Sequence, residues 1–172
     1  KWGAPKRLAT LIDQKKTHEP SMSITMDEKT LYFVSERDGG YVGNDIYSCT
    51  KKEDGNWSEP KNMGPEINTQ LDEEAPFIDG DTDEFYFSSQ GHNSIGGFDI
   101  FRSGSENGQR QTPVNMGFPV NSGSDDIFFT LDSTRTKGYF SSVREGGSGN
   151  YDIHEINFIK VADVFLSVKE KI

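Results

Sequence analysis

The chain has 172 residues, and its 28 acidic against 18 basic residues give a formal net charge of −10. This acidic balance argues against nucleic-acid binding, which needs a basic face, and against docking on an anionic membrane surface. No apolar run reaches the roughly 18 residues that span a bilayer, no signal peptide is visible, and the single cysteine argues against an intramolecular disulfide framework and the usual cysteine-based zinc sites.

Three segments of the chain repeat one pattern, an aromatic run followed by a glycine-rich loop and an Asp–Ile pair. The copies cover residues 31–47, 85–101 and 138–154. The step from the phenylalanine of the aromatic run to the aspartate is the same in every copy: Phe33 to Asp45, Phe87 to Asp99 and Phe140 to Asp152. A repeat period of about 53–54 residues is therefore predicted over residues 1–158.

Each repeat is predicted to form four short strands, because apolar alternation and aromatic enrichment mark short runs between turn residues. The first strands are expected at 20–25, 75–78 and 127–131, the second at 31–35, 85–89 and 138–142, and the third at 45–50, 99–103 and 152–156. The fourth strand is expected around Trp57 and the matching segment 112–122. The single Cys49 falls in a third strand and is expected to be packed rather than reactive.

Stacking such sheets radially would bury the two faces that one four-stranded sheet leaves open, so the repeats predict an all-β fold, a partial β-propeller. It would hold about three four-stranded antiparallel blades, plus the outer strand of a preceding blade at residues 2–8. Four aromatic residues are expected to pack structurally: Tyr32, Tyr86, Tyr139 and Trp57. Because propellers have at least about four blades, three predict either a piece of a longer propeller or a chain that meets other chains. Residues 159–172 fit no repeat and are predicted to be an outer strand or the start of a following domain.

The motifs Tyr-Phe-Ser-Ser, Arg-x-Gly-Gly, Gly-x-Asp-Ile-Tyr, Trp-Ser-Glu-Pro-x-Asn-x-Gly and Ile-Asn-Thr carry a resemblance. Together they resemble the WD-like (TolB-type) propeller repeat of OmpA-like, peptidoglycan-associated envelope proteins of the Bacteroidetes type, including a periplasmic component of the type IX secretion system. The resemblance implies a place in the periplasm or at the outer membrane of a Gram-negative bacterium. The partners it implies are other envelope proteins, or further blades and domains of the same parent protein. The peptidoglycan-binding motif is not present here, so glycan binding is not implied.

Asp45, Asp99 and Asp152 open the third strand of each repeat and allow two interpretations. They could form a ring of carboxylates that binds a ligand, or each could accept backbone N–H bonds and close its own loop. The threefold repetition favours the structural interpretation, because a ligand site is usually singular whereas scaffold residues recur.

One loop position supplies the candidate binding face, with the pairs Arg37–Asp38, His92–Asn93 and Arg144–Glu145. Loops on a rigid scaffold commonly bind partners, and arginine is frequent at interaction hot spots. The alternative is a solvated rim with weak local ion pairs. No metal or cofactor is expected: the three histidines are scattered, and the acidic residues 79–84 lack the full calcium-loop pattern and match a turn in the other repeats.

The sequence thus predicts a non-enzymatic interaction scaffold of the bacterial envelope that does not span the membrane. No Gly-x-Ser-x-Gly elbow is present, and no pair of carboxylates stands out as a glycosidase pair. One alternative is a propeller domain accessory to a glycan- or peptide-cleaving enzyme, with its catalytic residues on another domain. A second is a sugar-sensing propeller with its ligand in the central channel. The isolated chain is also expected to self-associate through its terminal blades.

Overall fold

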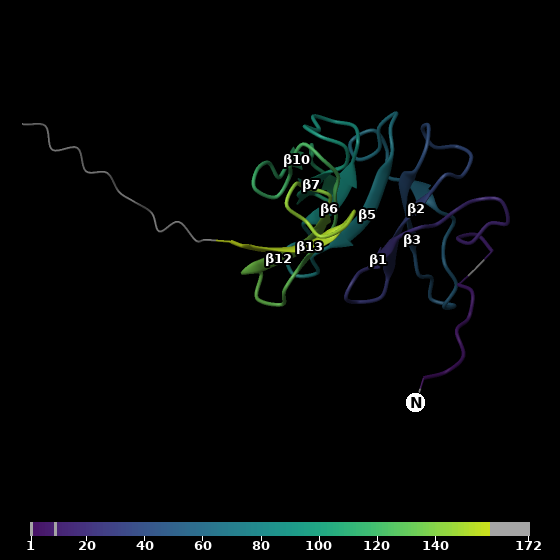
Figure 1. The fold of residues 1–172 in the computed structure, drawn as a ribbon. Helices are drawn as coiled ribbons and strands as arrows, with labels where there is room; N and C mark the ends of the chain where they lie inside the picture. The colour runs from purple at the N-terminus through teal and green to yellow at the C-terminus, as the bar shows by residue number, and fades with distance from the viewer. Residues whose placement is uncertain (1, 9, 159–172) are drawn as a thin grey trace, which may run out of the picture.

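A computed structural model describes residues 2–8 and 10–158 of the chain. These residues form an all-β protein without helices, built from three small antiparallel sheets and one separate hairpin (Figure 1). In this described part, no helix is long and apolar enough to cross a membrane. The predicted strand or domain start at 159–172 lies outside the described residues.

The long strands lie where the repeat pattern predicts them. The first sheet has the order β1 (Met22–Ile24), β2 (Thr30–Ser35), β3 (Asp45–Thr50) and β4 (Lys61–Asn62). The second has the order β5 (Glu73–Ile78), β6 (Phe85–Ser89), β7 (Asp99–Ser103) and β10 (Val114–Asn115). The third holds β11 (Asp126–Leu131), β12 (Lys137–Ser142) and β13 (Asp152–Asn157), so four described strands are confirmed for two sheets only.

The fourth strands are shorter than expected, and a hairpin was not predicted. β4 and β10 have two residues each and begin after a proline, which cannot donate a ladder hydrogen bond. Trp57 precedes β4 and makes only an isolated bridge with Lys51. The hairpin joins β8 (Ser105–Glu106) to β9 (Gln109–Arg110) through Asn107 and Gly108, both at positive φ, which is the turn chemistry that two-residue hairpins favour.

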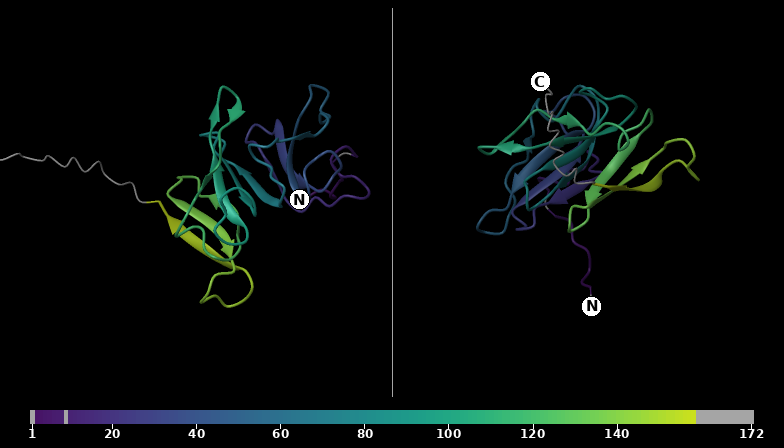
Figure 2. Two further views of the ribbon diagram at one scale, coloured as in Figure 1. Left: turned by 90° about the horizontal axis from the view of Figure 1, so that it is seen from above. Right: turned by 90° about the vertical axis from the view of Figure 1, so that its left-hand side faces the viewer.

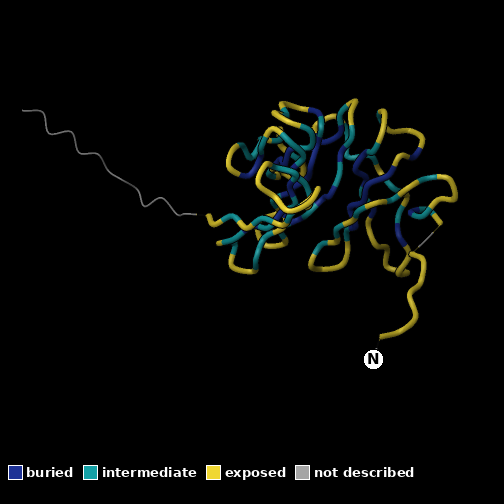
Figure 3. The backbone as a smooth tube through the Cα atoms, viewed as in Figure 1, coloured by how far each residue is buried: buried dark blue, intermediate teal, exposed yellow. Residues whose placement is uncertain are grey.

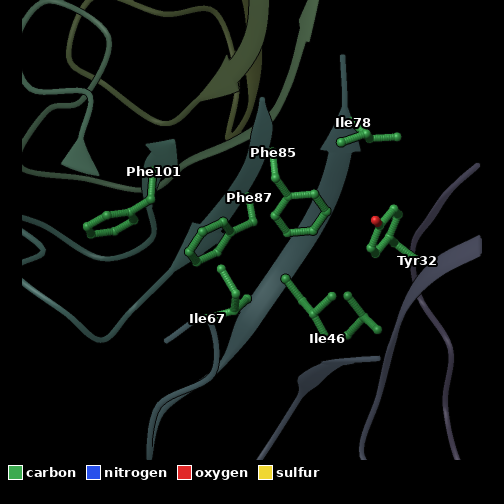
Figure 4. Close-up of a cluster of buried hydrophobic side chains, with 8 residues drawn as sticks. Tyr32, Ile46, Ile67, Ile78, Phe85, Phe87 and Phe101 are labelled. Carbon is green, nitrogen blue, oxygen red and sulfur yellow. The ribbon is translucent and has the colours of Figure 1, made fainter. Parts of the chain in front are cut away.

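Apolar side chains fill the space between consecutive sheets. Between the first and second sheets lie Tyr32, Val34, Ile46, Ile67, Ile78, Phe85, Phe87 and Phe101 (Figure 4). Between the second and third sheets lie Tyr86, Ile100, Val120, Phe129 and Phe140. Burying each large side chain stabilises the fold by roughly 1.5–3 kcal/mol, so the contacts between sheets carry much of the stability.

The three sheets lie side by side in chain order (Figure 2). Their first strands are neighbours, since β1 contacts β5 and β5 contacts β11. Hydrogen bonds also link the first sheet to the second: the Ser21 hydroxyl donates to Glu74 at 3.1 Å and accepts the Ala75 N–H at 3.0 Å. Each sheet is therefore held by its neighbour through both apolar packing and hydrogen bonds.

Candidate interaction face

Three glycine-rich loops lie at the same end of the three sheets. They join β2 to β3 (residues 36–44), β6 to β7 (90–98) and β12 to β13 (143–151). Backbone bonds link the first two loops to the following sheet, because the Glu73 N–H donates to the Asn44 carbonyl at 2.8 Å and the Asp126 N–H donates to the Phe98 carbonyl at 2.7 Å. Figure 3 shows these loops as mostly exposed and the long central strands of the first two sheets as mostly buried.

Each loop is closed by the aspartate that ends it. Asp45 Oδ2 accepts the Tyr41 N–H at 2.6 Å and the Asn62 amide at 3.1 Å. Asp99 Oδ2 makes the same two bonds, with the Ile95 N–H at 2.7 Å and the Asn115 amide at 2.8 Å. Asp152 Oδ2 accepts the Ser148 N–H at 2.7 Å. All three carboxylates thus bind backbone of their own loop, which is the geometry that a structural role requires.

Burial sets the protonation behaviour of two of these aspartates. Asp45 and Asp99 are buried, and desolvation raises the pKa of each above its ordinary value, against the opposing effect of their hydrogen bonds. Their Oδ1 atoms are buried without a hydrogen-bond partner among the described residues. In that part of the chain, no group of three or more His, Cys, Asp or Glu side chains is placed to hold a metal ion.

A second aspartate reaches each of the first two loops from the next sheet. Asp72 Oδ1, just before β5, accepts the Asn44 N–H at 2.8 Å. Asp125 Oδ1, just before β11, accepts the Phe98 N–H at 2.9 Å. Gly43 and Gly97 lie so close to these carboxylates that any side chain at either position would collide with them. The loops are therefore fixed from both sides, by their own sheet and by the following one.

The two arginines of the predicted binding face are bonded inside the protein. Arg37 is buried, stacks on Phe33 at 4.7 Å from the ring centroid, and donates to the carbonyl oxygens of Leu11 (3.0 Å) and Ile12 (2.6 Å). Arg144 repeats this arrangement, stacking on Phe140 at 5.0 Å and donating to the Pro119 carbonyl at 2.8 Å. Both guanidinium groups fasten the segment that leads into their own sheet.

His92 occupies the corresponding place by a different route. Counting from the aromatic run, Gly91 and not His92 is in register with Arg37 and Arg144. The His92 ring nevertheless lies against Phe87 and Phe101, and its Nε2 is 3.0 Å from the Ile67 carbonyl oxygen. The imidazole thus takes the position of an arginine from one residue further along the chain.

An acid beneath each loop completes the network; Glu73 and Asp126 are buried and Glu19 is half-buried. Glu19 and Asp126 each bond an arginine, Arg37 at 3.4 Å and Arg144 at 2.6 Å. Among the described residues, Glu73 instead accepts from two hydroxyls and one N–H: Thr69 Oγ1 at 2.8 Å, Ser89 Oγ at 2.7 Å and Thr69 N at 2.9 Å. Burial without a cationic partner raises the pKa of Glu73 to about 7.

Four residues of the predicted face are exposed: Asp38, His92, Asn93 and Glu145. Sequence reasoning missed two exposed apolar side chains in the same loops, Val42 and Ile95. Both lie next to the glycines of their loops, and an apolar residue within a glycine-rich loop is the signal that could have identified them. The face therefore combines acidic and polar side chains with apolar tips.

The acidic turn at residues 79–84 connects β5 to β6, and ion pairs link it to the turn between β11 and β12 of the third sheet. Arg135 donates to Asp79 at 2.7 Å and also bonds Asp81. Arg110 donates to Asp83 at 2.9 Å. These carboxylates are therefore bonded to arginines of other segments.

The chain matches no protein-family model and no curated protein sequence.

Proposed function

We propose that the three sheets are consecutive blades of a β-propeller and that the chain is a non-enzymatic protein-interaction module. The radial arrangement is supported by the repeat period, by the neighbouring first strands β1, β5 and β11, and by the apolar clusters between consecutive sheets. The scaffold presents three equivalent loops, and the proposed function is to bind a partner with them.

The observation that carries the proposal is that the first two loops are each fixed from two sheets. Asp45 and Asp99 hold their own loops, while Asp72 and Asp125 hold the same loops from the next sheet. Rigid loops lose little conformational entropy on binding, which favours recognition. The candidate carboxylates and arginines are bonded to the backbone of the protein itself, which favours presentation of the loops over catalysis.

The exposed chemistry of the three loops indicates the kind of partner. Val42 and Ile95 offer apolar contact, and the exposed Glu36, Asp38 and Glu145 bring negative charge to the first and third loops. A protein with a small apolar patch and a basic rim would complement this face. The resemblance to WD-like envelope repeats supports another cell-envelope protein of a Gram-negative bacterium as that partner, in the periplasm or at the outer membrane.

Site-specific photo-crosslinking in the envelope of the source cell tests this function. A photoreactive residue replaces Val42 or Ile95, and the matched control replaces Glu53, which is exposed in the turn at the other end of β3. We expect one discrete crosslinked product from the two loop positions and none from Glu53. Crosslinking that is equal at all three positions, or absent from both loop positions, would contradict the proposal.

A further inference from the structure

The segment before the first sheet copies the segments that join one sheet to the next. Aligned without a gap, Trp2, Pro5, Lys6, Arg7, Ile12 and Asp13 correspond to Trp57, Pro60, Lys61, Asn62, Ile67 and Asn68. In the joining segments, the first half forms the outer strand of one sheet and the second half rests on the following sheet. The early segment therefore contains an outer strand for a sheet that would precede the first.

The joining segments show what this outer strand does. In β4, Asn62 lies opposite Tyr47 and its amide donates to Asp45 at 3.1 Å. Further on, Asn68 Oδ1 accepts the Ile46 N–H at 2.8 Å and its Nδ2 donates to the Ile46 carbonyl at 2.9 Å. The second sheet repeats every one of these positions, with Asn115 opposite Phe101 and Asn121 bonded to both backbone groups of Ile100.

The early segment already has half of this arrangement. Ile12 is buried in the cluster with Leu31 and Phe33, held by Arg37 as Arg144 holds the segment before the third sheet. Arg7 bonds Asp13, as Asn62 bonds Asn68 at 2.9 Å. Residues 2–8, by contrast, are exposed and pair with no strand in the described part of the chain.

The third sheet, conversely, has neither an outer strand nor a covering sheet in the described part of the chain. Ile153 is 82% exposed, whereas Ile46 and Ile100 at the same repeat position are 0% exposed beneath the next sheet. Tyr139 is half-buried, whereas Tyr32 and Tyr86 are buried. Within the described residues, β13 pairs with β12 alone, so its outer edge lacks the strand that β4 and β10 provide elsewhere. Residues 2–8 thus offer a strand, and the third sheet offers an edge and a face.

We propose that these two ends bind each other between two copies of the chain, head to tail. Residues 2–8 of one copy pair with β13 of the other. The registers of β4 and β10 predict Arg7 opposite His154 and Lys6 opposite Glu155, with Asp13 over Ile153. Arg7 then takes the place of Asn62 and lies beside Asp152, so two cations meet two carboxylates.

The geometry also predicts a closed assembly. A head-to-tail contact closes only when the rotation between copies completes a ring, and otherwise it continues as a filament. On the proposed propeller arrangement, two copies of three sheets give six, which lies within the roughly 4–8 blades of known propellers. The proposed partner is therefore one second copy, in which residues 2–8 and β13 engage β13 and residues 2–8 of the first.

Sedimentation equilibrium of the full chain, with charge variants, tests the contact. We expect a dimer for the unaltered chain and a dissociation constant roughly tenfold higher for Arg7→Glu, which sets a carboxylate beside Asp152. Asp13→Asn introduces the amide that Asn68 has at the corresponding position. We expect it to tighten the dimer roughly fivefold, because the amide adds a hydrogen bond to the Ile153 carbonyl. The control Lys16→Glu changes charge equally at an exposed position outside the segment and should leave the constant unchanged.

Engineered cysteines test the register. Lys6→Cys with Glu155→Cys should form disulfide-linked dimers on oxidation, since facing residues of antiparallel strands are close enough for a disulfide. Lys6→Cys with Asn157→Cys is displaced by two residues and should link far less. A monomer at every concentration, a dimer indifferent to both Arg7→Glu and Asp13→Asn, or equal linking in the two pairs would overturn the proposal. The loop-face crosslinking is independent of these results, so the two proposals can fail separately.

Discussion

Replacing Asn121 by alanine would test how the second and third sheets are joined. The Asn121 side chain is fully buried, with Oδ1 2.8 Å from the Ile100 nitrogen and Nδ2 2.8 Å from the Ile100 carbonyl oxygen. Alanine leaves the Ile100 N–H buried without a partner, whereas the Ile100 carbonyl keeps its bond from the Met116 N–H at 3.0 Å. An unpaired buried group costs about 1–3 kcal/mol, so we expect the free energy of unfolding to fall by about 1–3 kcal/mol, a considerable share of the stability of a typical domain.

Urea denaturation followed by far-UV circular dichroism gives this change directly. The change in tryptophan fluorescence reports the first sheet, because Trp57 is buried there whereas Trp2 is already fully exposed in the folded chain. We expect the circular dichroism transition of Asn121→Ala to move to lower urea, with a smaller effect on the Trp57 signal. The matched control is Asn93→Ala, at an exposed loop position. If both variants lost the same small free energy, below about 1 kcal/mol, the reasoning about the bridging amide would be refuted.

Three further predictions concern single side chains. Asp99→Ala should lower the free energy of unfolding by about 1–2 kcal/mol by opening the second loop, and an unchanged thermal transition would count against the structural role. Because burial raises the pKa of Glu73 to about 7 from an ordinary 4.5, the native state keeps a proton that the unfolded chain releases; stability should therefore fall between about pH 4.5 and 7, by up to about 3 kcal/mol. Urea titrations at pH 5 and 8 measure this, and Glu73→Gln should flatten the slope, while an equal slope in the variant would exclude Glu73 as its source. Burial raises the pKa of the Cys49 thiol to about 11, so a thiol reagent at pH 8 should label it only after unfolding.

The long strands and the loop-closing aspartates could be predicted from the sequence because their causes are local. The apolar alternation of a strand lies within one short window of sequence. An aspartate and the backbone N–H that donates to it from four residues earlier also lie within such a window, as with Asp45 and Tyr41. The threefold repetition then separated these signals from chance.

The arginines could not be placed in the same way, because their partners are distant in sequence. Arg37 bonds carbonyl oxygens 25 and 26 residues earlier, and only the folded chain brings those groups together. In the sequence, Gly91 and not His92 is in register with the two arginines. Only the folded chain shows that the His92 ring nevertheless reaches the position of the arginine side chains. The Asn107–Gly108 hairpin was the opposite case: its turn signal was local and was overlooked.

Asp72 and Asp125 link each of the first two loops to the sheet that follows it. Asn44 and Phe98 are each held by a carboxylate of the following sheet, Asp72 and Asp125. The loop at residues 143–151 receives no such bond from a following sheet in the described part of the chain. Association of a second copy at the β13 edge, as proposed above, would place a following sheet beside that loop. The proposed dimer contact and the proposed interaction face would then be coupled, because the third loop would gain a neighbour on its open side when the two copies associate.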